Sequence, residues 1–466
     1  MSTLDPRHLP QDRLSSTNED GSRLWIIPAR VRGPWKNRKT IFHICLLLLF
    51  VLIPWLRYNG RPLFLFDIFN RQFVFLGHVF GAHDGPLLFF VLGILGFSLI
   101  VATAIWGRVW CGWACPQTVF IEQVFRRIET WVIGNRAMQL DCHKNPLKPG
   151  NLTKIVIKWV LFVIVSLFLS HTFIAYFVSW ESLLQMMSQA PQDSWTVFLF
   201  VFIIAAILLF DFAWFREQFC IIMCPYGRFQ SVLMDQNSLT ITYDYTRGEP
   251  RNRKITDIPA HSGDCIDCFK CVSVCPTGID IRNGLQLECI ACTACIDACD
   301  EVMEKIQRPK GLIRYAAQSD LERKQGRKWF RPRLLLYFVV LLAMISGLAY
   351  SVSQHKSYYY SVLRQGQRPY VVNDGVLLNN YRIHFKNPSL NHMEYEVRIQ
   401  STGVKMSPDL IQGRLAPNES IHRPFFLEIQ NFQGKPLPQV KLLFRFRGKR
   451  SWEESSQFVQ MVGPKP

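Results

Sequence analysis

The stretch CIDCFKCVSVCPTGIDIRNGLQLECIACTACIDAC, residues 265–299, contains eight of the 14 cysteines of the chain. It repeats the spacing C-x2-C-x2-C-x3-C twice, and this run binds pairs of [4Fe–4S] clusters. Three neighbouring cysteines bind one cluster, and the fourth reaches across to the other. We therefore expect one cluster on Cys265, Cys268, Cys271 and Cys299, and a second on Cys275, Cys289, Cys292 and Cys295.

This ferredoxin-like run departs from the usual pattern at one position, and its spacing differs from that of zinc ribbons. Pro276 follows the first copy and Asp300 follows the second, a departure that removes no ligand because proline does not bind iron. Paired zinc ribbons need C-x2-C pairs separated by a longer gap. We expect the module to pass single electrons, and a purely structural role is the alternative.

The cysteines as a whole indicate metal ligands rather than disulfides. Ten of them lie in tight spacings between Cys220 and Cys299. Disulfide frameworks are typical of short secreted chains, whereas dense cysteines in a long chain favour metal binding in a reducing compartment.

Apolar residues are concentrated in runs, and 49% of the chain is hydrophobic. A membrane span needs about 17–25 such residues. Five runs predict a polytopic α-helical membrane protein with spans at 41–57, 87–106, 155–177, 195–214 and 334–351. Residues 62–80 are apolar but are interrupted by Asp67, Asn70 and Arg71, so we expect an interfacial or re-entrant segment there rather than a sixth span.

The basic residues predict the orientation, because cytoplasmic loops collect Lys and Arg. The loop at 107–154 is rich in both, whereas the loop at 178–194 has neither. This asymmetry predicts a cytoplasmic N-terminus, a cytoplasmic 215–333 segment and an outer C-terminus. It also accounts for the net charge of +18, and no nucleic-acid-binding motif is present.

Both ends of the chain differ from the membrane core. Residues 1–22 are polar and are expected to be disordered, and no removable signal peptide is recognised. Residues 360–466 alternate apolar and polar side chains, as at Tyr381, Ile383 and Phe385, with turn-forming proline pairs between the runs. This pattern predicts a small β-sandwich, and no internal disulfide holds it because it contains no cysteine.

An outward loop, an apolar run and a C-x3-C-P motif occur twice, as a weak internal repeat. The first motif is Cys111-Gly-Trp-Ala-Cys115-Pro116, and the second is Cys220-Ile-Ile-Met-Cys224-Pro225. The i, i+4 spacing predicts both thiols of a motif on one helix face. Both motifs are expected at the cytoplasmic membrane face, where four thiolates would suit Cu(I), zinc or an iron–sulfur cluster. Buried cysteines at helix ends are the alternative.

The expected organisation follows from these features. It comprises a basic cytoplasmic tail at 1–40, four spans with the first C-x3-C-P motif at 41–214, a cytoplasmic segment with the second motif and the ferredoxin-like module at 215–333, a fifth span at 334–351 and a periplasmic domain at 360–466.

Weaker candidates lie outside these motifs. Cys142-His143 is either a metal-binding pair or an ordinary exposed pair. His43 and His171 lie within apolar runs, where ionisable residues are functional candidates, and two such histidines could ligate a non-covalent haem. Cys45 is expected to pack in the membrane and Asp211 to lie at its interface.

Together these features resemble the family of the cytochrome c oxidase accessory protein CcoG, also called FixG or RdxA. The resemblance covers nearly the whole chain. It rests on the spans, the second C-x3-C-P motif, the ferredoxin pair, the β-domain and the stretch Gly107-Arg108-Val-Trp-Cys111-Gly-Trp-Ala-Cys115-Pro116-Gln117-Thr118. The membrane polyferredoxins of nitrate and nitrous oxide respiration are more distantly similar and lack this β-domain.

The resemblance implies a cupric reductase of the bacterial inner membrane that supplies reduced copper for assembly of cbb3-type oxidase. It further implies an immunoglobulin-like domain at 360–466 and a copper-reduction site at Cys111, Cys115, Cys220 and Cys224. The expected partners are the lipid bilayer, copper, cbb3 assembly factors and an electron donor that the sequence does not name. A homodimer is left open.

Two other functions remain as alternatives. One is an electron conduit between quinol and a periplasmic partner, and the other is a non-catalytic copper chaperone or assembly scaffold. The ferredoxin-like module argues against the scaffold, because a scaffold has no need of two redox clusters.

Overall fold

The computed structural model describes residues 23–58, 60–68, 72–75, 78–80, 85–252, 263–323, 331–353, 358–366, 370–373, 375–387, 391–401, 403–417, 419–430, 437–447 and 452–464. The tail at 1–22, predicted to be disordered, lies outside these residues. The chain divides into two compact units, one of Met1–Ile68 with Leu88–Leu348 and one of Phe69–Leu87 with Ala349–Pro466.

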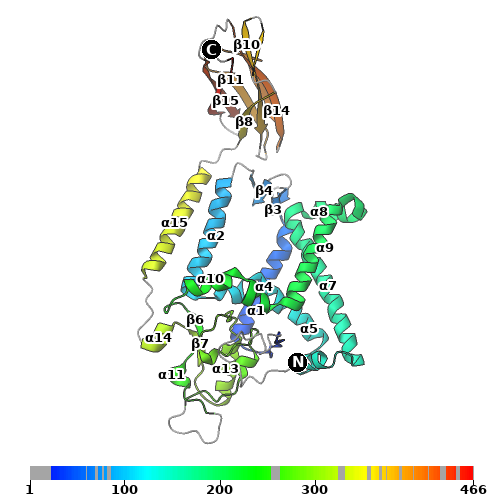
Figure 1. Cartoon of the computed structure of the whole chain (residues 1–466), viewed down its shortest axis with the longest axis vertical. Helices are drawn as coiled ribbons and strands as arrows, with labels where there is room; N and C mark the ends of the chain where they lie inside the picture. Colours follow the sequence, from blue (N-terminus) through cyan, green and yellow to red (C-terminus); the bar gives the residue numbers. More distant parts are fainter. Residues whose placement is uncertain are drawn as a thin grey trace. The chain divides into compact units, whose positions relative to one another are not determined.

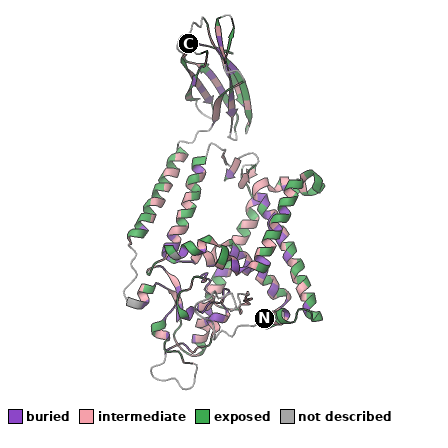
Figure 2. Cartoon of the chain, in the orientation of Figure 1, coloured by how far each residue is buried: buried purple, intermediate pink, exposed green. Residues whose placement is uncertain are grey.

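Five long apolar helical segments confirm the predicted spans. In each segment, at most 22% of the residues in the most apolar stretch are buried within the protein. The apolar side chains therefore face outward, as lipid-facing helices require (Figure 2). The segments are α1 Pro34–Leu52 with the 3-10 turn η2 Ile53–Trp55, α2 Gly85–Trp106, α7 Pro149–Val178, α9 Trp195–Leu209 between η5 Pro191–Ser194 and the π-helix η6 Phe210–Phe215, and α15 Pro332–Ser353 (Figure 1).

Short helices connect the spans. Between α2 and α7 they are α3 Val109–Trp113, α4 Pro116–Phe120, the π-helix η4 Ile121–Phe125, α5 Arg126–Val132 and α6 Arg136–Lys144. Beyond α7 they are α8 Trp180–Ser188, the π-helix η7 Phe219–Met223 and α10 Pro225–Leu233. The ring of Phe125 lies 4.9 Å from that of Phe162 and 5.3 Å from that of Phe212, so η4 packs against both α7 and η6.

The ferredoxin-like module follows α10. Strands β6 Thr240–Tyr243 and β7 Ile313–Ala316 pair antiparallel and bracket it in sequence. Between them lie α11 Tyr245–Gly248, α12 Lys270–Ser273, the 3-10 turn η8 Ile281–Asn283 and α13 Ala294–Lys305, and α14 Gln318–Arg323 follows. Apolar residues and most of the cysteines form the shared core of this module.

The first span begins inside the predicted basic tail, because helix α1 starts at Pro34. No residue of its own caps the helix. Instead, the Asp297 carboxylate of α13 accepts hydrogen bonds from the amides of Trp35 and Lys36, at 3.2 and 2.7 Å. A capping carboxylate satisfies the free amides at a helix start and matches its dipole. The ferredoxin-like module is therefore fixed to the start of the first membrane helix.

The segment predicted to be interfacial or re-entrant contains short strands where it is described. Strand β1 Arg57–Tyr58 pairs with β2 Arg61–Pro62, and β4 Gln72–Phe75 pairs with β5 His78–Phe80. Strand β3 Phe64–Asp67 packs its aromatic rings on α7, where the Phe64 ring lies 5.9 Å from that of Tyr176.

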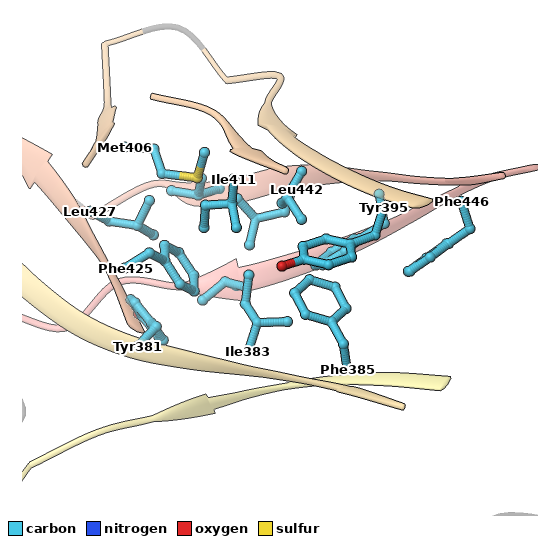
Figure 3. Packing of buried hydrophobic residues seen from close by; sticks show 14 of the residues in the cluster. Tyr381, Ile383, Phe385, Tyr395, Met406, Ile411, Phe425, Leu427, Leu442 and Phe446 are labelled. Atoms are coloured by element: carbon cyan, nitrogen blue, oxygen red, sulfur yellow. The ribbon is translucent and has the colours of Figure 1, made fainter. Parts of the chain in front are cut away.

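The C-terminal unit confirms the predicted β-sandwich. One sheet has the order β12-β14-β10-β8, with β9 also pairing β10, and the other has the order β13-β11-β15-β16. The strands are β8 Tyr359–Arg364, β9 Val371–Asn373, β10 Val376–Lys386, β11 Met393–Ile399, β12 Lys405–Ser407, β13 Ile411–Leu415, β14 Ser420–Ile429, β15 Gln439–Arg447 and β16 Trp452–Gln460. Side chains of both sheets interdigitate between them, with the Phe385 ring 4.3 Å from that of Tyr395 (Figure 3).

Candidate functional site

The two cysteine repeats of the ferredoxin-like module share a backbone pattern that their spacing alone does not reveal. In the first, Asp267 and Phe269 have φ values of 52° and 56°, and in the second the equivalent Ala291 and Thr293 have 53° and 66°. Left-handed residues are uncommon outside glycine and turn successive amides toward one concave side. Each loop therefore curls around a centre, as a cluster-binding loop does.

Two small cavities lie within these loops. One is lined by Cys265, Cys268, Cys271 and Cys299. The other is lined by Cys289, Cys292 and Cys295 together with Cys271 and Cys275. Each cavity thus has three cysteines from one repeat; the first adds Cys299 from the other repeat, and the second adds Cys271 and Cys275. Because Cys271 already lines the first cavity, these linings favour the predicted crossed ligand sets. Four thiols around an apolar cavity fit a [4Fe–4S] cluster.

Burial raises the pKa of several of these thiols. Burial and the neighbouring thiolates together raise the pKa of Cys275 to about 11 and those of Cys289 and Cys299 to about 12. Four thiolates packed together need a cationic centre to balance their charge, and bound iron supplies it.

The two C-x3-C-P motifs do not form continuous helices, so the expectation of two thiols on one helix face was wrong. Cys111 lies in α3, which ends at Trp113, and Cys115 is extended with φ −64° and ψ 126°. Cys220 lies in η7, and Cys224 is likewise extended. Proline disfavours helical geometry in the residue before it and is suited to the first helical position. Each motif therefore breaks at its second cysteine, and a new helix, α4 or α10, begins at the proline.

The four thiols lie within electrostatic range of one another. Burial, together with the charges of Cys115 and Cys224, raises the pKa of Cys111 to about 11. Burial, Cys115 and Cys111 likewise raise the pKa of Cys220. The Cys111 thiol lies 3.4 Å from the Oε1 atom of Gln230. Within the described ranges, however, no three His, Cys, Asp or Glu side chains converge closely enough for a single metal ion.

The first motif packs directly on the second cysteine repeat. A methyl group at Gly112 would overlap the carbonyls of Ile290 and Ala291, which lie between the cluster cysteines 289 and 292. The buried Arg108 guanidinium donates to the carbonyls of Leu287, Cys289 and Gly227. One side chain therefore joins the first motif, the cluster loop and the second motif.

Aromatic rings fill the same interface. The Trp113 indole Nε1 lies 3.4 Å from the Tyr315 hydroxyl, which lies 3.4 Å from the Ala291 carbonyl oxygen. Trp35 packs against both rings, with centroids at 6.2 and 5.5 Å. Packed aromatic side chains thus surround the contact between the cysteine motif and the cluster loop.

The remaining predicted candidates have other neighbours. His43 is fully buried, with Nδ1 3.2 Å from Nε2 of Gln123, and His171 Nδ1 lies 2.7 Å from the Leu167 carbonyl of its own helix. Cys142 is buried, and His143 stacks on Trp25. Cys45 is exposed on α1.

Asp211 has a closer relation to the site than the sequence indicated. Its Oδ1 accepts a hydrogen bond of 2.9 Å from Gln117 Nε2, and Gln117 directly follows the first motif. Asp211 was expected only as an interfacial residue. Arg108 and Gln117 were named only within the stretch that carries the family resemblance, and Gln230 and Tyr315 were not singled out. Arg108 and Gln117 flank the first motif, and this position was the available signal for both.

Family models match three parts of the chain. A 4Fe-4S dicluster domain matches residues 215–318, a 4Fe-4S binding domain matches residues 87–137, and the IG-like fold at the C-terminal of FixG matches residues 348–461. The two 4Fe-4S family models and the five membrane helices define the class of protein: this is a multi-pass iron–sulfur membrane oxidoreductase.

Known relatives extend over most of the chain. The chain is 34% identical over 402 residues to Protein RdxA of Cereibacter sphaeroides, and the match covers 82% of this chain and 84% of that protein. It is 33% identical over 407 residues to the nitrogen fixation protein FixG of Rhizobium meliloti, covering 78% and 76%. Protein RdxB of Cereibacter sphaeroides is 34% identical over 406 residues, covering 81% and 82%. The chain belongs to the FixG/RdxA family.

Proposed function

We propose that this protein is a cupric reductase, which takes single electrons from its ferredoxin-like module and reduces Cu(II) to Cu(I) at Cys111, Cys115, Cys220 and Cys224. The observation that carries the proposal is the contact of Gly112 with the carbonyls of Ile290 and Ala291. It supports a short electron path between the cluster loop and the membrane-face thiols.

The eight ferredoxin cysteines would hold two [4Fe–4S] clusters in the crossed sets that the cavity linings favour. When bound, these clusters store and release one electron each. The protein around them fixes the distance to the substrate: Arg108 joins the two cysteine motifs to the cluster loop.

The thiols at the membrane face would bind the copper substrate. Each Cu(II) ion would take up one electron and leave as Cu(I). Thiolates are soft ligands and favour Cu(I). The thiols therefore make the reduction easier. The family resemblance supports a role in supplying Cu(I) for cbb3-type oxidase assembly. The family resemblance supports a location in the bacterial inner membrane. The basic 107–154 loop supports a cytoplasmic N-terminus and a periplasmic C-terminal domain.

A further [4Fe–4S] cluster at the same four thiols is the second candidate. A 4Fe-4S binding domain matches residues 87–137, which include Cys111 and Cys115. In this case the site would relay electrons rather than bind a copper substrate.

The test is anaerobic reduction of Cu(II) by reduced protein, followed with a Cu(I)-specific chelator. Cys111→Ser with Cys115→Ser should abolish the reduction, and so should Cys220→Ser with Cys224→Ser, because two thiolates bind Cu(I) less tightly than four. Cys45→Ser, an exposed cysteine on the first span, is the matched control and should keep the full rate. Unchanged reduction in both double variants would refute the copper site and favour the conduit between quinol and a periplasmic partner.

A further inference from the structure

A cavity of about 660 Å³ lies beside the ferredoxin-like module, within the first compact unit. One wall is the N-terminal segment 26–32. The amide of Ala29 donates to the Ser273 carbonyl at 2.8 Å, and Arg136 Nε donates to the Ile27 carbonyl at 2.7 Å. The segment is thus fixed both to the cluster module and to α6, and it encloses a space large enough for a cofactor-sized molecule.

The lining is strongly cationic. It contains eight Arg and Lys side chains but only two carboxylates, Glu122 and Glu129. Both carboxylates are already paired: Lys36 and Lys39 lie 3.0 and 2.7 Å from Glu122, and Arg216 lies 2.6 Å from Glu129. Burial alone would raise the pKa of Glu122, but the two lysines hold it below its usual range.

Three of the cationic groups remain available to a ligand. Arg30, Arg32 and Arg127 line the cavity, and all three are exposed. None of them forms an ion pair with another residue in the described part of the chain. Guanidinium groups bind phosphate through paired, charge-assisted hydrogen bonds. The cavity therefore has the charge to hold a phosphate ester.

The cavity also reaches the second cluster loop. Cys292, a predicted ligand of the second cluster, contributes to the lining together with Pro276. Lys39 Nζ lies 3.4 Å from the Cys292 carbonyl oxygen. The Trp131 side chain, which is 85% exposed, also borders the cavity and offers an aromatic face for a planar ring.

We propose that this cavity is the electron-input site and binds a reduced flavin mononucleotide, with its phosphate at Arg30, Arg32 and Arg127 and its ring beside Cys292. The proposal rests on the proposed function in naming the electron donor for the clusters, and it does not depend on copper. An uncharged quinol gains nothing from a cationic lining, and a reduced nicotinamide transfers a hydride rather than single electrons.

A flavin carries both the phosphate and the one-electron chemistry. One reduced flavin would give up two electrons and two protons. Each of the two clusters would accept one electron, and the two protons would pass to solvent. The electron count thus matches a two-cluster module.

The experiment uses the full-length protein in nanodiscs of zwitterionic phosphatidylcholine, under anaerobic conditions. Binding of flavin mononucleotide is followed by quenching of its fluorescence, and cluster reduction by the reduced flavin is followed by loss of visible absorbance. The triple variant Arg30→Glu, Arg32→Glu and Arg127→Glu should bind the flavin at least about 100-fold more weakly, since a tenfold loss corresponds to about 1.4 kcal/mol. Its iron content and the extent of its reduction by dithionite should not change.

Lys148→Glu, which alters an exposed basic residue outside the cavity lining, should bind the flavin as the unmodified protein does. Equal binding in the triple variant, or no cluster reduction in the unmodified protein, would overturn the proposal. Displacement of the flavin by phosphatidylglycerol, without any cluster reduction, would identify a site for a lipid headgroup instead. Copper reduction driven by dithionite is measured in the same preparations, so failure of the flavin site and failure of the copper site give different results.

Discussion

The two groups of cysteines differ in how the chain brings them together. The ferredoxin-like module takes eight cysteines from the single stretch 265–299, whereas the second group takes four from the two C-x3-C-P motifs, which are separated by 105 positions, from Cys115 to Cys220. The first group depends on local loop geometry, with left-handed residues at equivalent places. The second depends on tertiary contacts, such as that of Arg108 with the carbonyl of Gly227 just beyond the second motif. Residues that are not ligands should therefore matter far more for the second group.

The largest difference should be in iron content. Cys299→Ser removes the ligand that crosses to the first cluster, so the protein should lose about four of about eight irons per chain. Iron analysis of anaerobically purified protein measures this loss. Cys45→Ser should lose no iron, and full iron retention in Cys299→Ser would contradict the crossed ligand sets.

Arg108→Gln should come next in effect. The shorter amide cannot reach the carbonyls of Leu287, Cys289 and Gly227 together, and a hydrogen bond to a charged group contributes about 1.5–3 kcal/mol. We expect a lower thermal midpoint and slower Cu(II) reduction at full iron content. The exposed Lys148→Gln variant serves as the control, and an unchanged rate in Arg108→Gln would show that the contact does not join the two groups.

Gly112→Ala should have a smaller but more specific effect. The added methyl group meets the backbone carbonyls of Ile290 and Ala291, whereas one at Gly96 meets no atom within 4 Å. Overpacking of this kind costs about 1–3 kcal/mol, and the displaced motif should reduce Cu(II) more slowly. The comparison is the rate in Gly112→Ala against that in Gly96→Ala, and equal rates would contradict the close approach.

Asp297→Ala should have the smallest effect of the four. It removes the cap of α1, which is worth about 0.5–2 kcal/mol, and leaves every cysteine in place. Thermal unfolding should show a modest decrease in the midpoint. Glu304→Ala on the same helix removes only an exposed ion pair with Lys310 and should change little. A decrease of the same size in both variants would mean that the cap does not fix the module to the helix.

The sequence allowed prediction of those features that are encoded over short distances. The cysteine spacing predicted the ferredoxin-like module, the apolar runs predicted five spans, and the alternation at Tyr381, Ile383 and Phe385 predicted the β-sandwich. Tertiary contacts were not predictable in this way. Nothing in the local pattern of Gly112 indicates that a loop 178 positions later packs against it. The helix break at Cys115 follows from Pro116, whose effect on the preceding residue outweighs the i, i+4 spacing.

The basic segment before the first span illustrates the same limit. The charges of Arg30, Arg32, Lys36 and Lys39 predicted a basic cytoplasmic tail. In the structure Lys39 is 1% exposed and is paired with Glu122, while Arg30 and Arg32 border a cavity beside the cluster loop. Charge patterning predicts which side of the membrane a segment occupies, but not the partner that each charge meets.

The iron content of the anaerobically purified protein, measured before and after replacement of both Cys111 and Cys115 by serine, tests the central claim most directly. The copper site predicts about eight irons per chain from two clusters, with the same number in the double variant although its Cu(II) reduction is lost. About twelve irons in the unmodified protein, falling to about eight in the variant, would contradict it and assign the four membrane-face thiols to a third cluster.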